Sequence, residues 1–148
     1  MERRPIFLVE DNADDELLIL RSLKRNNVSN GVIIARDGVE ALDYLFGTGS
    51  QADKQPIKPS VVLLDIKLPK IDGLQVLERI REDERTKLLP VVVLTSSDEE
   101  RDLLRSYQLG VNSYVRKPVD FAEFSEAITK LGLYWLLLNE LPPESSME

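Results

Sequence analysis

The sequence has 148 residues, the size of one ordinary domain, and 43% of them are hydrophobic, which excludes a disordered chain. It holds 26 acidic and 19 basic residues, a formal charge of -7, without the Lys and Arg cluster that a nucleic-acid surface needs. The absence of cysteine and histidine excludes disulfides and thiolate or imidazole metal sites. No apolar run reaches the ~18 residues of a membrane span. We therefore expect a cytoplasmic protein.

Five short strand-like segments alternate with amphipathic segments along the chain. The first four are continuously apolar and rich in β-branched residues, as strands buried on both faces of a parallel sheet are. The predicted strands are Ile6–Val9, Val32–Ala35, Val61–Leu64, Val91–Leu94 and Ser113–Val115. This alternation predicts an α/β fold of the (βα)5 type, with an open, doubly wound, five-stranded parallel sheet and right-handed crossovers.

Each predicted strand is followed by residues that favour the start of a helix. The first helix is expected after Asn12, where three acidic residues suit the positive end of its dipole. The later starts pair an acid or Ser with Glu or Gln three residues on: Asp37 with Glu40, Asp72 with Gln75, Ser97 with Glu100, and Asp120 with Glu123.

Two segments depart from the regular pattern. Gly47–Pro59 is polar and predicts a surface loop between the second helix and the third strand. The last helix is expected to run from Asp120 to about Leu141, where two prolines end it, and residues 142–148 to form a disordered tail. There is no repeat, so we predict a single domain over residues 1–148.

Polar residues follow the carboxyl ends of four strands, the edge where open parallel sheets place their functional sites. They are Glu10-Asp11, Asp65, Thr95-Ser96 and Lys117-Pro118. Carboxylates meeting at one edge favour a cation, because two unit charges ~4 Å apart repel by ~1 kcal/mol in water and ~4 kcal/mol at a dielectric of ~20. Oxygen ligands alone suit magnesium. With Lys117 and Thr95 they would hold a phosphoryl group in transfer, and Asp65 would be free to act as nucleophile.

Each of these residues also has an ordinary structural explanation. The alternatives are helix capping for Glu10 and Asp11, a plain strand end for Asp65 and Thr95, solvent exposure for Lys117 and sheet packing for Tyr114. The combination favours the chemical interpretation, because independent strand ends supply compatible groups.

The sequence resembles the response-regulator receiver family across essentially the whole chain. The matching elements are Val9-Glu10-Asp11-Asn12, the stretch from Leu64-Asp65 through Pro69 to Asp72-Gly73, Leu94-Thr95-Ser96-Ser97 and Val115-Arg116-Lys117-Pro118. The resemblance implies a flavodoxin-like receiver fold with Asp65 as the phosphorylated residue. It implies Mg2+ as cofactor, held by Glu10, Asp11, Asp65 and the backbone carbonyl of Lys67. It also implies that Lys117 pairs with phosphoryl oxygens and that Thr95 and Tyr114 form a switch pair.

One residue departs from the family pattern. Lys67 stands where the family often has Asn or an apolar residue. Its side chain could reach the metal edge and alter the lifetime of the aspartyl phosphate.

The predicted last helix is apolar on almost every side. One stripe has the spacing to pack on the sheet: Phe121, Phe124, Ile128, Leu131, Trp135 and Leu138. A second set remains, namely Leu133, Tyr134, Leu137 and Leu141. We expect this set to form a homodimer face with the fifth strand, the alternative being a satellite core against Gly47–Pro59. The extended end resembles that of phytochrome-associated response regulators of cyanobacterial type.

The resemblance implies a single-domain response regulator that receives its phosphoryl group from a partner histidine kinase, of phytochrome type. It would catalyse only its own phosphorylation and dephosphorylation, without a DNA-binding output domain and with neither nucleic acid nor membrane as partner. Two alternatives remain open. A phosphatase with an aspartyl-phosphate intermediate generally has a second Asp at the position of Lys67, and a pseudo-receiver would lack one of the acids or Lys117.

Overall fold

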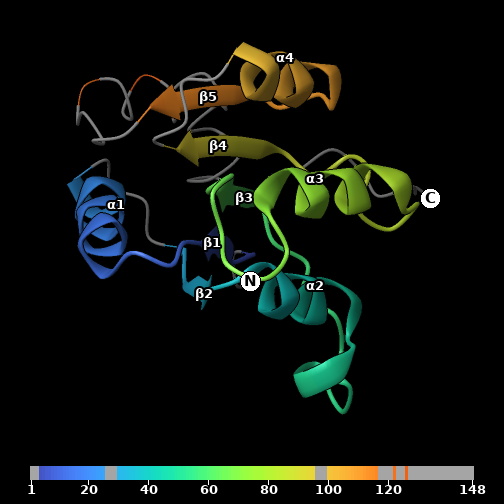
Figure 1. The fold of residues 1–148 in the computed structure, drawn as a ribbon. Coiled ribbons are helices and arrows are strands. Elements are labelled where there is room, and N and C mark those ends of the chain that lie inside the picture. Colours follow the sequence, from blue (N-terminus) through green and yellow to red (C-terminus); the bar gives the residue numbers. More distant parts are fainter. Residues whose placement is uncertain (1–3, 26–29, 96–99, 117–121, 123–125, 127–148) are drawn as a thin grey trace.

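The computed structural model describes residues 4–25, 30–95, 100–116, 122 and 126 (Figure 1). Its elements are β1 (Ile6–Val9), α1 (Ala13–Arg25), β2 (Val32–Ala35), α2 (Gly38–Phe46), the 3-10 helix η1 (Gly49–Gln51), β3 (Val61–Leu64), α3 (Gly73–Glu82), β4 (Val91–Thr95), α4 (Glu100–Gln108) and β5 (Ser113–Arg116). All five predicted strands are confirmed, and the last two extend one residue further than predicted.

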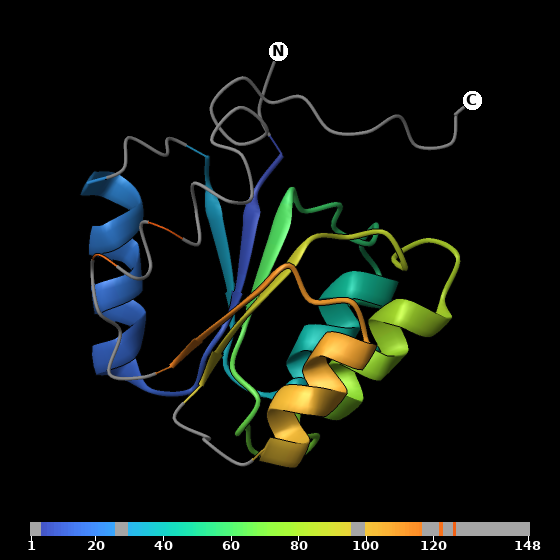
Figure 2. The same ribbon diagram turned by 90° about the horizontal axis from the view of Figure 1, so that it is seen from above.

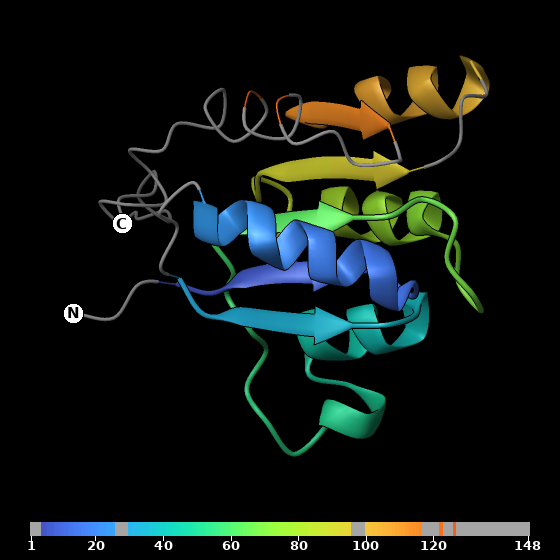
Figure 3. The ribbon, with the colours of Figure 1, turned by 90° about the vertical axis from the view of Figure 1, so that its left-hand side faces the viewer.

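The strands form one parallel sheet in the order β2-β1-β3-β4-β5 (Figure 3). β1 lies between β2 and β3, with Val9 level with Ala35 on one side and Leu64 on the other. The chain therefore winds one way from β1 to β2 and the other way from β3 to β5. The carboxyl ends of β1 and β3 meet where this direction changes, which is the point where such sheets bind ligands.

Helices cover both faces of the sheet. Seen from above, α1 lies on one face, and α2, α3 and α4 lie on the other (Figure 2). Successive strand residues alternate between two cores, so that Phe7 packs on the α2–α3 side while Leu8 packs with Ile19 and Leu23 of α1. Burial on both faces explains why the strands are continuously apolar, and the predicted doubly wound sheet is confirmed.

Polar side chains define the starts of three helices. Asn12, Asp37 and Asp72 each accept a backbone N–H from the first turn of the helix that follows, at 3.0, 2.8 and 2.7 Å. Gln75 completes a capping box by accepting the backbone N–H of Asp72 at 3.2 Å. These three predicted starts are confirmed. Ser97 and the tail 142–148 lie outside the described residues, as does the predicted last helix from Asp120 except for Ala122 and Glu126, which are helical.

The predicted loop Gly47–Pro59 is anchored at both ends. At its start, Asp43 accepts the Thr48 hydroxyl at 2.9 Å and, through its carbonyl, the N–H of Gly47 at 2.8 Å. Toward its end, Ile57 packs against the core on the α2–α3 side and donates its N–H to the carbonyl of Tyr44 at 3.0 Å. The loop leads into the amino end of β3, away from the edge where the strands end.

Arg81 of α3 joins α3 to the end of α4. Its guanidinium donates to four backbone carbonyls, those of Leu109, Lys87, Leu89 and Gly110, at 2.6 to 3.0 Å. Burial lowers the pKa of Arg81 from its ordinary value. The turn after α4 is thereby fixed to α3.

Among the described residues, no helix is long and apolar enough to cross a membrane.

Candidate functional site

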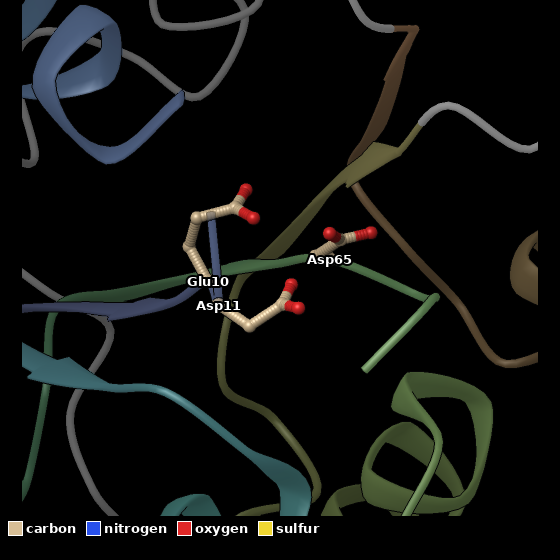
Figure 4. A group of neighbouring side chains, drawn as sticks. All are labelled: Glu10, Asp11 and Asp65. Carbon is tan, nitrogen blue, oxygen red and sulfur yellow. The ribbon is translucent and has the colours of Figure 1, made fainter. Parts of the chain in front are cut away.

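Three carboxylates meet at the carboxyl ends of β1 and β3 (Figure 4). Glu10 and Asp11 follow β1, Asp65 follows β3, and one oxygen of each carboxylate lies within 4.8 Å of the other two. The sheet itself fixes their backbones, because Glu10 N donates to the carbonyl of Ala35 and Asp65 N to that of Val9, both at 3.0 Å. The structure thus brings together the three acids named from the sequence.

Burial makes this cluster costly without a cation. Glu10 and Asp65 are 1% and 4% exposed, whereas Asp11 is exposed. Charges this close repel by several kcal/mol once water is partly excluded, roughly 4 kcal/mol at an effective dielectric of ~20. Carboxylate oxygens with one open side are the donor set that a hard divalent cation prefers. The residues present therefore fit a magnesium-like ion.

The two buried acids are oriented by backbone N–H groups. Glu10 Oε2 accepts the N–H of Asn12, the residue before α1, at 3.1 Å, while Asn12 itself accepts the first-turn N–H of Asp15. Asp65 Oδ1 accepts the N–H of Lys67 at 3.0 Å. One oxygen of Asp65 is therefore held in place by the chain that follows it.

Gly73 lets α3 pack directly on the backbone of Asp65. A Cβ at this position would lie 2.2 Å from the carbonyl oxygen of Asp65 and 2.6 Å from Cα of Ile66. The N–H of Gly73 donates to the carbonyl of Ile66 at 2.7 Å. Asp72 thus caps α3, and Gly73 is the only residue type that fits so close to the backbone of Asp65.

The remaining predicted residues are only partly visible. Thr95 ends β4 and pairs with Arg116 of β5, but its side chain, like all of Lys117, lies outside the described part of the chain. Tyr114 lies on β5 level with Val93, is half-buried and packs against the core on the α2–α3 side. Of the predicted switch pair, the side chain of Tyr114 is described and that of Thr95 is not.

The side chain of Lys67 turns toward α4. Its ammonium lies 3.3 Å from Oδ2 of Asp102, whose side chain is 5% exposed. Sequence reasoning named Lys67 but missed Asp102. Asp102 and Ser106 are four residues apart and both buried, so they mark the inward face of α4, while Leu104 is 58% exposed. That spacing was the available signal.

Sequence reasoning also missed how the segment after Asp65 contacts α2. Lys70 Nζ lies 3.3 Å from Oδ2 of Asp37, and Gly38 N lies 3.4 Å from the carbonyl oxygen of Pro69. The backbone N–H of Glu40, with help from the Lys70 ammonium, holds the pKa of Asp37 below its ordinary value. The predicted helix cap is thus also an anchor for this segment.

Comparison with known families matches residues 6–129 to the response regulator receiver domain. Among curated relatives, the probable methanogenesis regulatory protein FilR2 of Methanothrix harundinacea is 41% identical over 93% of this chain and 86% of its own length. Response regulator Rcp1 of Synechocystis is 37% identical over 93% of this chain and 92% of its own length.

Solved structures give the same picture. The bacteriophytochrome response regulator AtBRR is 54% identical, with a TM-score of 0.79 over 95% of this chain and 100% of its own. The phosphorylated cyanobacterial phytochrome response regulator RcpA is 39% identical, with a TM-score of 0.78 over 95% and 99%. The Mn(2+)-bound form of Rcp1 is 36% identical, with a TM-score of 0.78 over 94% and 99%.

Proposed function

The chain belongs to the response regulator receiver domain family, and we propose that it accepts a phosphoryl group on Asp65 from a histidine kinase of phytochrome type. As a member of that family it is a signalling protein rather than a classical enzyme. The phytochrome assignment is supported by the similarity to AtBRR and RcpA, which are described as phytochrome response regulators.

The proposed metal ligands are Glu10, Asp11, Asp65 and the backbone carbonyl of Lys67. When bound there, Mg2+ would neutralise the acids and polarise the phosphoryl oxygens. The Mn(2+)-bound form of Rcp1 supports a divalent ion in this family. Support from this chain is the set of three carboxylates within 4.8 Å of one another, which lacks sulfur and nitrogen donors.

In the proposed transfer, a carboxylate oxygen of Asp65 attacks the phosphorus of a phosphohistidine on the kinase. An O–P bond forms, the P–N bond breaks, and its electron pair stays on the imidazole nitrogen, which then takes up a proton. The N–H of Lys67 holds Oδ1 of Asp65, and the second oxygen would approach phosphorus. Lys117 would pair with the charge on the phosphoryl oxygens.

The phosphorylated state would end by hydrolysis. Water attacks the phosphorus, the O–P bond to Asp65 breaks, and the carboxylate is regenerated together with inorganic phosphate. Until then, the Thr95 hydroxyl and the Tyr114 ring would carry the change to the surface formed by β5 and α4. Phosphorylation would thereby bias an equilibrium between two conformations.

The convergence of Glu10, Asp11 and Asp65 at the switch point of the sheet carries this proposal. We would incubate the protein with acetyl phosphate and Mg2+ and measure its intact mass. We expect a gain of one phosphoryl group that disappears in Asp65→Asn and with EDTA. Asp53→Asn, at an exposed acid in the loop Gly47–Pro59, is the matched control and should still gain it.

The outcomes separate the proposal from its rivals. Wild-type protein that stays unmodified would indicate a pseudo-receiver. Rapid turnover of unrelated phosphomonoesters would indicate a phosphatase.

We also propose that the protein is cytoplasmic and dimerises through its last helix and the face of β5. The acidic, cysteine-free composition suits the first proposal. The second rests on the apolar sequence of residues 131–141. The signal would then leave through protein contacts or through a change in dimerisation.

A further inference from the structure

We propose that Lys67 and Asp102 form a charge link that reports phosphorylation of Asp65 to helix α4. The inference rests on the proposed function, because it requires a phosphoryl group on Asp65. It assigns a role to an ion pair that the transfer reaction itself does not use.

Lys67 contacts both ends of the link. Its backbone N–H donates to Asp65 Oδ1 at 3.0 Å, and its ammonium lies 3.3 Å from Asp102 Oδ2 in the first turn of α4. A single residue therefore touches the phosphoacceptor and the helix that packs beside α3. A movement of the Lys67 side chain can therefore affect both Asp65 and α4.

The two partners are unequally exposed. The side chain of Asp102 is 5% exposed and that of Lys67 is 46% exposed. A buried carboxylate needs nearby positive charge to offset its desolvation, whereas a half-exposed ammonium on a flexible stem can turn to another anion. The ion pair therefore breaks more readily by movement of the Lys67 side chain than by movement of Asp102.

Phosphorylation supplies such an anion next to Lys67. Converting the Asp65 carboxylate to an acyl phosphate raises the local negative charge by about one unit and adds three acceptor oxygens. The ammonium of Lys67 then has a stronger partner within reach of its four-carbon stem. As it turns toward the phosphoryl group, Asp102 loses positive charge in a buried position.

The rest of α4 is held independently of Asp65. Arg105 forms an ion pair with Glu78 of α3 at 3.0 Å, and Arg81 holds the carbonyls of Leu109 and Gly110 just beyond the helix. The end of α4 therefore stays attached to α3. The first turns, which carry Asp102, are the part that phosphorylation would loosen.

Hydrogen exchange of the amides in residues 100–108 tests the link, with and without acetyl phosphate and Mg2+. In wild-type protein we expect several-fold faster exchange after phosphorylation. In Asp102→Asn, which keeps the shape and removes the buried charge, we expect exchange near the basal wild-type rate that does not change on phosphorylation. Lys67→Gln leaves the buried carboxylate without the Lys67 charge, so its exchange should already be fast and should not change on phosphorylation, and Lys67→Arg should restore the wild-type response.

Arg105→Gln is the matched control, because it breaks an ion pair between α4 and α3 without touching the segment after Asp65. It should raise the basal exchange rate and still respond to phosphorylation. The intact mass of each sample gives the phosphorylated fraction.

A phosphorylated wild-type protein whose α4 exchange is unchanged or slower would overturn the charge link and leave the proposed function standing. An equal response in phosphorylated Asp102→Asn would do the same. Absence of any mass gain in wild-type protein would reject the proposed function, and the charge link with it.

Discussion

At the scale of single residues, the position of Asp65 depends on a neighbour that has no side chain. Gly73 begins α3 directly against the carbonyl of Asp65, and a Cβ there would lie 2.2 Å from that oxygen. Real Cβ atoms do not approach an oxygen so closely, so a larger residue has to push α3 and β3 apart. The geometry of the acid cluster therefore depends on this glycine.

We predict that Gly73→Ala lowers the free energy of unfolding by about 1–3 kcal/mol, the usual range for overpacking a filled site. It should also slow phosphorylation by acetyl phosphate, because Asp65 shifts relative to Glu10 and Asp11. Gly31→Ala is the control, since a Cβ at Gly31 meets nothing within 4 Å. Urea denaturation of both variants makes the comparison, and equal stability of the two would contradict the packing argument.

The acids of the site were predictable from the sequence because each apolar run shows where a strand ends. Glu10, Asp11 and Asp65 each follow a continuous apolar run, and parallel strands align their carboxyl ends. The pairing of Lys67 with Asp102 was not predictable in this way. A lysine at that position has several anions within reach, and the one it contacts depends on how α4 packs.

At the scale of elements, the start of α2 combines a helix cap with an ion pair. Asp37 accepts the N–H of Glu40 and lies 3.3 Å from the ammonium of Lys70. Both interactions favour the ionised carboxylate and lower its pKa below the ordinary 3.8. Stability from this group is therefore fully present above about pH 3.8 and is lost as the pH falls through the lower folded-state pKa.

We predict that Asp37→Ala is about 1 kcal/mol less stable than wild-type protein at neutral pH, the typical loss for a helix cap. The gap should shrink as the pH is lowered toward about pH 2. Asp37→Asn keeps the accepting oxygen without a charge, so its cap should not depend on pH. Urea denaturation across this range measures the gap, and a gap between wild type and Asp37→Ala that stays constant would contradict the assigned pKa.

The elements themselves were largely predictable. Strands rich in Val, Ile and Leu and capping pairs such as Asp72 with Gln75 are local signals, and the structure follows them. The inward face of α4 was not predictable from hydrophobicity, because it carries Asp102 and Ser106 while Leu104 faces solvent. The short helix η1 also escaped prediction, since Asp43 and the packing of Ile57 hold its loop.

At the scale of the whole molecule, the order of the strands creates the site. A parallel (βα)5 pattern fixes neither which strands are neighbours nor where the winding reverses. In the observed order β2-β1-β3-β4-β5, β1 and β3 are neighbours, which puts Glu10 and Asp11 beside Asp65. The same arrangement places α4 close enough to α3 for Arg105 to pair with Glu78.

We predict that the protein sediments as a dimer held together by its last helix. Replacing Leu133, Tyr134 and Leu137 together with polar residues should shift it toward the monomer, because each apolar side chain at an interface contributes about 1.5–3 kcal/mol. A triple replacement of exposed residues of α1, Leu17, Leu18 and Arg21, is the control and should leave the dimer intact. An unchanged sedimentation coefficient in the first variant would argue against this face.

In the proposed function, the acids converge so that one carboxylate, that of Asp65, attacks phosphorus. Reductive trapping identifies the attacking residue: the protein is phosphorylated with acetyl phosphate and Mg2+, reduced with borohydride and sequenced by mass spectrometry. We predict a single reduced residue, at position 65, and none when EDTA is present. Reduction at Glu10, at Asp11 or at an acid outside the cluster, with Asp65 intact, would contradict it.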